Sequence, residues 1–238
     1  MEILPPLYAL IVAGGSGTRM KSTTPKQFML VQEKPVLLHT LEKFQQLPQS
    51  IHTILVLPKE HINTWEKIAQ QYRYTPQISI VEGGNTRTAS VINGLKAIQD
   101  SEENSLVAIH DAVRPFISPE LIWQSFQTAH QTGTALAVVA SKDAIRYVDT
   151  QTAKNHQVDR KYYYLVQTPQ TFRVDLIKDA YEKYTRNAFQ PEVQDDASVA
   201  ELAGHSITLI EGNYNNLKIT TPEDITWANF LLQTEVKK

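Results

Sequence analysis

The chain has 238 residues, of which 42% are hydrophobic, enough to fill the core of one large α/β domain. Its 23 basic and 25 acidic residues give a formal net charge of -2 and form no broad basic patch, which argues against a nucleic-acid partner. With no cysteine, disulfides, thiolate nucleophiles and Cys-ligated zinc are excluded. Apolar runs such as 135–140 are far shorter than the ~20 residues that cross a bilayer, and no basic start precedes the first run. We therefore expect a cytoplasmic protein with no membrane partner.

Apolar runs of strand length alternate with helical patterns along the chain. The predicted strands, in chain order, are residues 7–13, 51–57, 78–81, 106–110, 135–140 and 207–210. The predicted helices are residues 35–47, 61–72, 86–98, 118–130 and 174–186, a short helix after Asp195, and a last helix from Thr221. This alternation predicts a single α/β domain over residues 1–238. Its sheet should be doubly wound and mainly parallel, with ligands at the carboxyl ends of the strands.

The pattern changes at residues 141–167, where the polar stretch 149–157 separates two apolar and aromatic segments. We expect an inserted, projecting two-stranded arm here. The arm is rich in tyrosine, and these side chains are either half-buried strand residues or part of a subunit interface: Tyr147, Tyr162, Tyr163 and Tyr164.

A glycine-rich segment, Ala13-Gly14-Gly15-Ser16-Gly17-Thr18-Arg19-Met20, directly follows the first predicted strand. Glycines let successive backbone N–H groups face an anion, and Arg19 and Lys26 add two cations. A Walker A loop is excluded because no Gly-Lys-Ser/Thr follows, and the dinucleotide fingerprint fails because Met20 stands where its third glycine belongs. The segment is a tight turn with solvated charges or a phosphate-binding loop, and the following Pro25-Lys26-Gln27 favours the loop.

A second glycine pair, Gly83-Gly84, follows a predicted strand and precedes the helix from Thr86. One interpretation is a plain turn in which Thr86 is the N-cap and Arg87 is a surface charge. In the other, the glycines pass close to a flat base and Ser90 reaches the nucleoside.

A third motif, Ile109-His110-Asp111-Ala112-Val113-Arg114-Pro115-Phe116, lies at a predicted strand end. A carboxylate there, facing phosphate-binding loops, suits Mg²⁺, which is usually held by one or two carboxylates and substrate phosphates. Asp111 is therefore a candidate metal ligand, although it is also placed to pair with Arg114. For His110 we favour a hydrogen-bonded structural role over a catalytic one.

Three polar motifs follow in the second half of the chain: Val158-Asp159-Arg160, Gln167-Thr168-Pro169-Gln170 and Asn216-Leu217-Lys218-Ile219-Thr220. Taken alone, Arg160 and Lys218 are typical solvated charges. They become candidate site residues only if a second anionic molecule binds beside the nucleotide.

These motifs, taken together and in this order, closely resemble those of the 2-C-methyl-D-erythritol 4-phosphate cytidylyltransferases of the non-mevalonate isoprenoid pathway. The resemblance extends over nearly the whole chain, from about residue 7 to residue 232. It implies a Rossmann-like nucleotidyltransferase fold, CTP and a polyol phosphate as substrates, Mg²⁺ as cofactor, and a homodimer formed through the arm at 141–167.

The resemblance also implies roles for individual residues. Arg19, Lys26, Arg160 and Lys218 would be catalytic, with Arg160 meeting the acceptor's phosphate from the partner subunit's arm. Asp111 would hold the metal ion. The remaining residues would bind nucleotide or substrate: Ala13, Gly14, Gly15, Ser16, Gly17, Gly83, Gly84, Asn85, Arg87, Ser90, Arg114 and Thr168.

Two positions depart from the family pattern. Asn85 stands where an aspartate is common, a change of little consequence if the backbone does the binding. Ala144 stands where a threonine or serine often lines the acceptor site, so one hydroxyl is missing from the polyol pocket.

Three other interpretations stay open on sequence alone. The nearest is a ribitol 5-phosphate cytidylyltransferase, since that branch shares the nucleotide motifs. A non-catalytic nucleotide-binding protein is disfavoured by the intact charged residues. The missing third glycine argues against a nicotinamide dehydrogenase.

Overall fold

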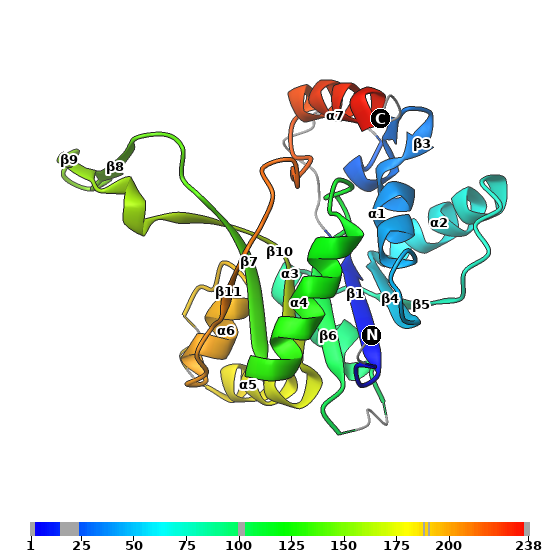
Figure 1. Ribbon diagram of the computed structural model, residues 1–238, viewed down its shortest axis with the longest axis horizontal. Coiled ribbons are helices and arrows are strands. Elements are labelled where there is room, and N and C mark those ends of the chain that lie inside the picture. Colours follow the sequence, from blue (N-terminus) through cyan, green and yellow to red (C-terminus); the bar gives the residue numbers. More distant parts are fainter. Residues whose placement is uncertain (1–2, 15–23, 100–102, 188, 190, 236–238) are drawn as a thin grey trace.

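The computed structural model describes residues 3–14, 24–99, 103–187, 189 and 191–235. Its centre is a seven-stranded sheet in the order β11-β7-β10-β6-β1-β4-β5 (Figure 1). The strands are β1 (Leu7–Val12), β4 (Ile51–Leu57), β5 (Ile78–Glu82), β6 (Leu106–Asp111), β7 (Thr134–Ala140), β10 (Tyr164–Arg173) and β11 (Leu209–Glu211). Neighbouring strands are parallel except at β10, which is antiparallel to β6 and β7. The predicted mainly parallel sheet is confirmed.

Both faces of the sheet are buried, because side chains that alternate along each strand pack under helices on opposite sides. In β1, Leu7, Ala9 and Ile11 belong to one apolar core, and Leu10 and Val12 belong to the other. The first core lies under α1 (Val36–Phe44), α2 (Lys59–Gln71) and α4 (Pro119–Thr132). The second lies under α3 (Arg87–Lys96), α5 (Val174–Arg186) and α6 (Asp196–Leu202). The sheet is therefore doubly wound, as predicted (Figure 1).

A smaller apolar cluster joins α7 (Pro222–Glu235) to Val31 of the short strand β2 (Leu30–Val31) and to Val36, which directly follows the short strand β3 (Lys34–Pro35). Val113, just after β6, packs in the same cluster, and its carbonyl accepts a hydrogen bond from the backbone N–H of Ile219 at 2.9 Å. This contact fixes the chain next to Lys218 against the end of β6.

The predicted arm is present and projects from the sheet at the left of Figure 1. It is a hairpin of β8 (Ile145–Val148) and β9 (Asn155–Val158), followed by the single turn η3 (Arg160–Tyr162). The expected strand pairing was wrong in detail. Residues 155–157, predicted as polar connection, form β9, and Tyr164 begins β10 of the central sheet instead of belonging to the arm. The arm tyrosines are exposed, Tyr162 by 73%.

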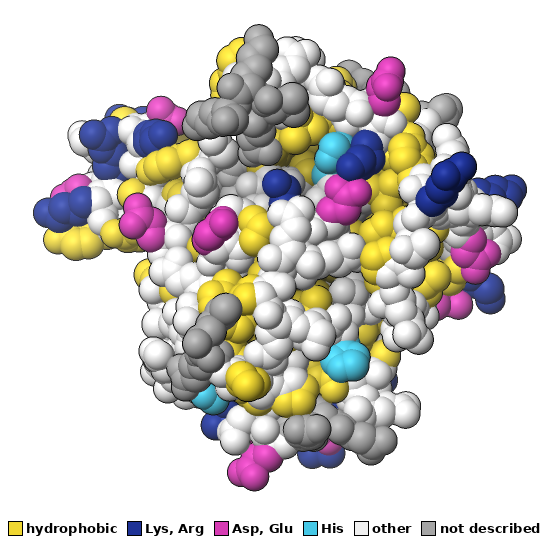
Figure 2. Space-filling model, turned by 45° about the vertical axis from the view of Figure 1, so that its right-hand side comes forward, with side chains coloured by type: hydrophobic (Ala, Val, Ile, Leu, Met, Phe, Trp, Pro, Cys, Tyr) yellow, Lys and Arg dark blue, Asp and Glu magenta, His cyan; other side chains and the backbone are white. Residues whose placement is uncertain are grey.

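Element boundaries differ slightly from prediction: α1 ends at Phe44 instead of residue 47, and β11 covers Leu209–Glu211 instead of 207–210. Within the described part of the chain, no helix is long and apolar enough to cross a membrane. Figure 2 shows Lys and Arg side chains gathered on the arm and otherwise scattered among acidic and neutral groups on that face.

Candidate active site

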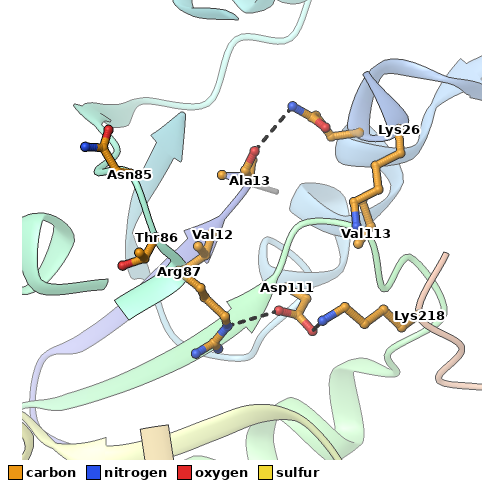
Figure 3. Close-up of a pocket in the computed structure, with 11 residues that line it drawn as sticks. Val12, Ala13, Lys26, Asn85, Thr86, Arg87, Asp111, Val113 and Lys218 are labelled. Carbon is orange, nitrogen blue, oxygen red and sulfur yellow. Dashed lines mark hydrogen bonds and ion pairs between the residues drawn. The ribbon is translucent and has the colours of Figure 1, made fainter. Parts of the chain in front are cut away.

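A pocket of about 300 Å³ lies at the carboxyl end of the central strands (Figure 3). It exists there because β1 and β6 are parallel and in register, with Val12 opposite Asp111, so the segments that follow both strands leave the sheet together. Seven of the predicted site residues line the pocket: Ala13, Gly14, Lys26, Asn85, Arg87, Asp111 and Lys218.

Asp111 is the electrostatic centre of the pocket. Only 6% of the residue is exposed, and three cations surround its carboxylate. Lys218 Nζ lies 2.9 Å and Arg114 Nε 3.2 Å from Oδ2, and Arg87 Nε lies 3.6 Å from Oδ1. Burial alone would raise the pKa of Asp111, but the charges of Lys218, Arg87 and Arg114 outweigh it and hold that pKa well below its usual range.

The charges of this cluster do not cancel. Arg87, Arg114 and Lys218 surround Asp111, and Lys26 lines the same pocket from the turn η2 (Lys26–Phe28). These four cations outnumber the two carboxylates that pair with them, Asp111 and Asp196. Figure 3 shows Arg87 and Lys218 reaching Asp111 from opposite sides. A pocket with excess positive charge is suited to a polyanion.

Arg87 is not the surface charge that one interpretation of the sequence allowed. Its two terminal nitrogens bond both carboxylate oxygens of Asp196 at 3.0 and 2.7 Å. Burial opposes its charge, but Asp196 and Asp111 more than offset this and raise the pKa of Arg87. The guanidinium is therefore a permanently charged group held in one orientation.

Arg114 and Thr168 lie behind the pocket and do not line it. Thr168 Oγ1 accepts a hydrogen bond from the backbone N–H of Asp111 at 3.1 Å and lies 3.1 Å from His110 Nδ1, while Arg114 donates to the carbonyl of Asn216 at 2.8 Å. His110 Nε2 is 3.3 Å from the carbonyl of Arg114, so the ring donates from Nε2 and accepts at Nδ1 from the Thr168 hydroxyl. These residues fix the position of Asp111.

Burial lowers the pKa of His110 to about 4, so its ring is neutral near pH 7. With both ring nitrogens hydrogen-bonded, His110 has the structural role that the sequence favoured.

The second glycine pair shapes the loop instead of lining the pocket. A Cβ on Gly84 would lie 2.4 Å from the Cβ of Ala89, so only glycine fits this close against α3. Ser90 Oγ accepts from the backbone N–H of Gly84 at 3.1 Å and donates to the carbonyl of Thr86 at 2.9 Å. Gly83, Gly84 and Ser90 thus hold the loop, which presents Asn85, Thr86 and Arg87 to the pocket.

Unlike Arg114 and Thr168, Arg160 lies neither in this pocket nor behind it. It lies on the arm, bonds the carbonyl of Lys142, and lines a separate hollow with Ala144, Gln157, Val158 and Asp159. Four further predicted residues lie outside the described part of the chain: Gly15, Ser16, Gly17 and Arg19.

Sequence reasoning missed three residues that support the site. Gln27 is buried and donates from Nε2 to the carbonyl of Ala13 at 3.3 Å, which ties η2 to the end of β1. Asn216 donates from Nδ2 to the carbonyl of Thr168 at 2.8 Å, and Asp196 holds Arg87. Gln27 and Asn216 stood inside motifs already recognised, whereas nothing in the sequence singled out Asp196.

The donor set around the pocket contains a single carboxylate. In the described ranges, no group of three or more His, Cys, Asp or Glu side chains is placed to hold a metal ion. Asp111 fits a hard cation that is bound mainly by substrate phosphates.

A doubly wound α/β sheet with a cationic pocket at its carboxyl edge is typical of the nucleotide-binding class of α/β proteins. The family model for 2-C-methyl-D-erythritol 4-phosphate cytidylyltransferase matches residues 7–234, and the chain belongs to that family. The resemblance inferred from the motifs is therefore confirmed, and the protein is a cytidylyltransferase of the non-mevalonate isoprenoid pathway.

Similar proteins share both sequence and fold over nearly their whole length. The chain is 42% identical to the 2-C-methyl-D-erythritol 4-phosphate cytidylyltransferase of Bacteroides thetaiotaomicron, covering 94% of this chain and 98% of the relative. The crystal structure of 4-diphosphocytidyl-2C-methyl-D-erythritol synthase from Anaerococcus prevotii has a TM-score of 0.82 at 34% identity, covering 96% of each chain. The corresponding structure from Thermus thermophilus has a TM-score of 0.75 at 28% identity and covers 97% of this chain and 100% of that one.

Proposed function

We propose that the pocket around Asp111 binds the triphosphate of CTP and that cytidylyl transfer takes place there. A phosphate oxygen of 2-C-methyl-D-erythritol 4-phosphate attacks the α-phosphorus in line, and the bond to the leaving pyrophosphate breaks. The products are 4-diphosphocytidyl-2-C-methyl-D-erythritol and pyrophosphate. The observation that carries this proposal is the excess of positive charge around Asp111, because the reaction must bring two polyanions together.

The reaction needs charge neutralisation and positioning more than it needs a base. A phosphate monoester is already an anionic nucleophile near neutral pH, so no side chain has to remove a proton. Lys26 and Lys218 line the pocket and neutralise the negative charge that develops on the phosphates. Arg19 and the backbone of the Gly14–Gly17 segment have the same role in this proposal.

Mg²⁺ is the proposed cofactor, and Asp111 is the residue that would hold it together with the phosphates of CTP. Bound there, the ion would neutralise part of the triphosphate charge and favour departure of pyrophosphate. Lys218 and Arg114 orient the Asp111 carboxylate through Oδ2.

The acceptor half of the site is completed in our proposal by a homodimer formed through the arm. Arg160 lies on the arm, which projects away from the sheet (Figure 1) and lines a hollow separate from the pocket. The arm carries exposed tyrosines, and basic side chains gather on it (Figure 2). The partner subunit's Arg160 would meet the acceptor's phosphate. Thr168 contributes indirectly in this proposal, because it lies behind Asp111 and its hydroxyl oxygen accepts a hydrogen bond from the backbone N–H of Asp111. A cytoplasmic location stays a prediction.

Pyrophosphate release from CTP and Mg²⁺ tests the proposal, with 2-C-methyl-D-erythritol 4-phosphate or ribitol 5-phosphate as the only acceptor. We expect rapid release with the methylerythritol compound, which also shows that Ala144 is tolerated. Release with ribitol 5-phosphate alone would contradict the proposed acceptor. If neither acceptor gave pyrophosphate, the protein would be one that binds the nucleotide without turnover.

Mixing two impaired variants, assayed at an acceptor concentration well below KM, tests the partner's contribution. If Arg160 acts on the other subunit, a mixed dimer of Lys26→Ala and Arg160→Ala subunits has one site with both residues intact, and activity returns on mixing. If Arg160 acts within its own chain, every site in the mixture is defective and no activity returns.

A further inference from the structure

The beginning of α6 is fixed to the sheet beside the candidate active site. Asp195, its N-cap, accepts a hydrogen bond from the backbone N–H of Ser198 at 2.9 Å. Gln170 of β10 donates to Asp195 at 3.1 Å and accepts from the backbone N–H of Ala197 at 2.8 Å. Since β10 pairs with β6, the strand that ends in Asp111, the first turn of α6 has a defined position relative to the pocket.

Asp196 occupies that turn and is completely buried, yet it does not line the pocket. Both of its carboxylate oxygens are occupied: Arg87 bonds Oδ1 and Oδ2, and the Tyr181 hydroxyl donates to Oδ1 at 2.5 Å. A buried carboxylate is tolerated only when it is paired and hydrogen-bonded in this way. Asp196, Tyr181 and Arg87 therefore form one unit.

Arg87 lies between two carboxylates that compete for it. Its terminal nitrogens are committed to Asp196, so only the Nε edge faces Asp111, at 3.6 Å from Oδ1, beyond hydrogen-bond distance. Oδ2 of Asp111, in contrast, is held by Lys218 and Arg114. Without Asp196, the planar guanidinium would be free to turn its two terminal nitrogens toward Asp111 and form the bidentate pair that arginine and carboxylate prefer.

We propose that Asp196 and Tyr181 are positioning residues for CTP binding, an inference that rests on the proposed function of the pocket. They prevent the guanidinium of Arg87 from forming a bidentate pair with Asp111. Its charge stays at the pocket wall, while Oδ1 of Asp111 stays open to the nucleotide with its cation.

The test compares two tyrosines one turn apart on α5. Tyr181→Phe removes the hydrogen bond to Asp196, and the matched control Tyr184→Phe removes a bond to the carbonyl of Pro191, away from Arg87. The dissociation constant for CTP with Mg²⁺ is measured by calorimetry, and the KM for the acceptor by pyrophosphate release. We expect Tyr181→Phe to weaken CTP binding about threefold and Asp196→Asn about tenfold or more, as for lost bonds to a charged group. The acceptor's KM should not change, and Tyr184→Phe should leave both quantities unchanged.

A double variant separates positioning from a general structural role. If Tyr181 acts through Arg87, Tyr181→Phe adds no loss of CTP affinity to that of Arg87→Ala. Additive losses, equal losses for both substrates, or a lower melting temperature with unchanged CTP affinity would each overturn the inference. Tyr181→Phe keeps the test valid if Asp196→Asn does not fold. A wild-type protein that binds CTP but releases no pyrophosphate would contradict the proposed function, while the CTP affinities would still decide this inference.

Discussion

The pocket and the arm carry their charged residues in opposite environments. At the pocket, Asp111, Arg114 and Asp196 are buried and bonded to one another or to Arg87 and Lys218. On the arm, Arg146 and Arg160 are exposed, and their partners are a nearby asparagine and a backbone carbonyl of the same arm. The charged groups of the pocket are therefore organised before any ligand binds, whereas the arginines of the arm are exposed and bonded only to neighbouring groups.

The difference between the buried charges of the pocket and the exposed charges of the arm shows that a single folded chain can supply the pocket by itself. Parallel register at β1 and β6 brings distant segments to one place, and burial then forces their charges to pair. An exposed two-stranded hairpin has no such core, so its sequence is free to be selected for contacts with another molecule. Four measurements test this contrast.

The largest effect is expected from Lys26→Ala in the pocket. Loss of one charge-assisted contact to the transition state costs about 3 kcal/mol of transition-state stabilisation, or roughly a hundredfold in turnover. Lys59→Ala is the matched control, because Lys59 is an exposed lysine paired loosely with Glu82 at 4.0 Å. Pyrophosphate release measures both variants, and unchanged turnover in Lys26→Ala would remove this residue from the mechanism.

Acid should weaken the pocket region through His110. Its pKa is near 6.5 when unfolded and about 4 when folded, so the unfolded state binds more protons between these values. The stability from the neutral ring is present above pH 6.5 and is lost as the pH falls toward 4, a decrease of roughly 3 kcal/mol. The lowered pKa of His39 acts with the same sign, and that of Asp111 matters only below about pH 4.

Urea unfolding at several pH values measures this dependence. His110→Gln should flatten the curve between pH 6.5 and 4, while His156→Gln on the exposed arm should leave it as in the wild type. An unchanged slope in His110→Gln would show that another group titrates.

A smaller, more selective effect is expected from Arg160→Ala on the arm. Loss of a phosphate contact should raise the KM for the acceptor about tenfold and leave CTP binding unchanged. Arg146→Ala is the control, since Arg146 bonds Asn155 within the hairpin. An effect on CTP alone would contradict the acceptor role.

The smallest effect is expected for the folding stability of the arm. Val148 is 53% exposed on β8, so Val148→Ala should change the free energy of unfolding by less than about 0.5 kcal/mol. Val107→Ala, at a fully buried position of β6, should cost about 2 kcal/mol. Chemical denaturation compares the two, and equal costs would show that the arm is packed against something.

Much of the fold could be predicted from the sequence because the local apolar patterns agree with the tertiary structure. The strand 51–57 and the helix 174–186 have the predicted bounds, since each apolar period matches a buried face. The arm was harder to predict: Tyr164 to Val166 read as arm, yet they begin β10, because pairing with β7 is a long-range contact that an apolar run does not encode.

The residues of the candidate site also fall into two groups: those that local motifs predict and those whose role depends on long-range contacts. The family, the mainly parallel sheet and the pocket residues Lys26, Asp111 and Lys218 could be predicted from the sequence, because they depend on local patterns and on short motifs with fixed spacing. Only the tertiary structure showed that Gly84 and Ser90 support a loop, that Thr168 bonds behind Asp111, and that Asp196 holds Arg87. Those roles depend on which groups meet when the sheet and its helices pack. Arg87 and Asp196 are 109 positions apart, and no local sequence pattern encodes a contact over that separation.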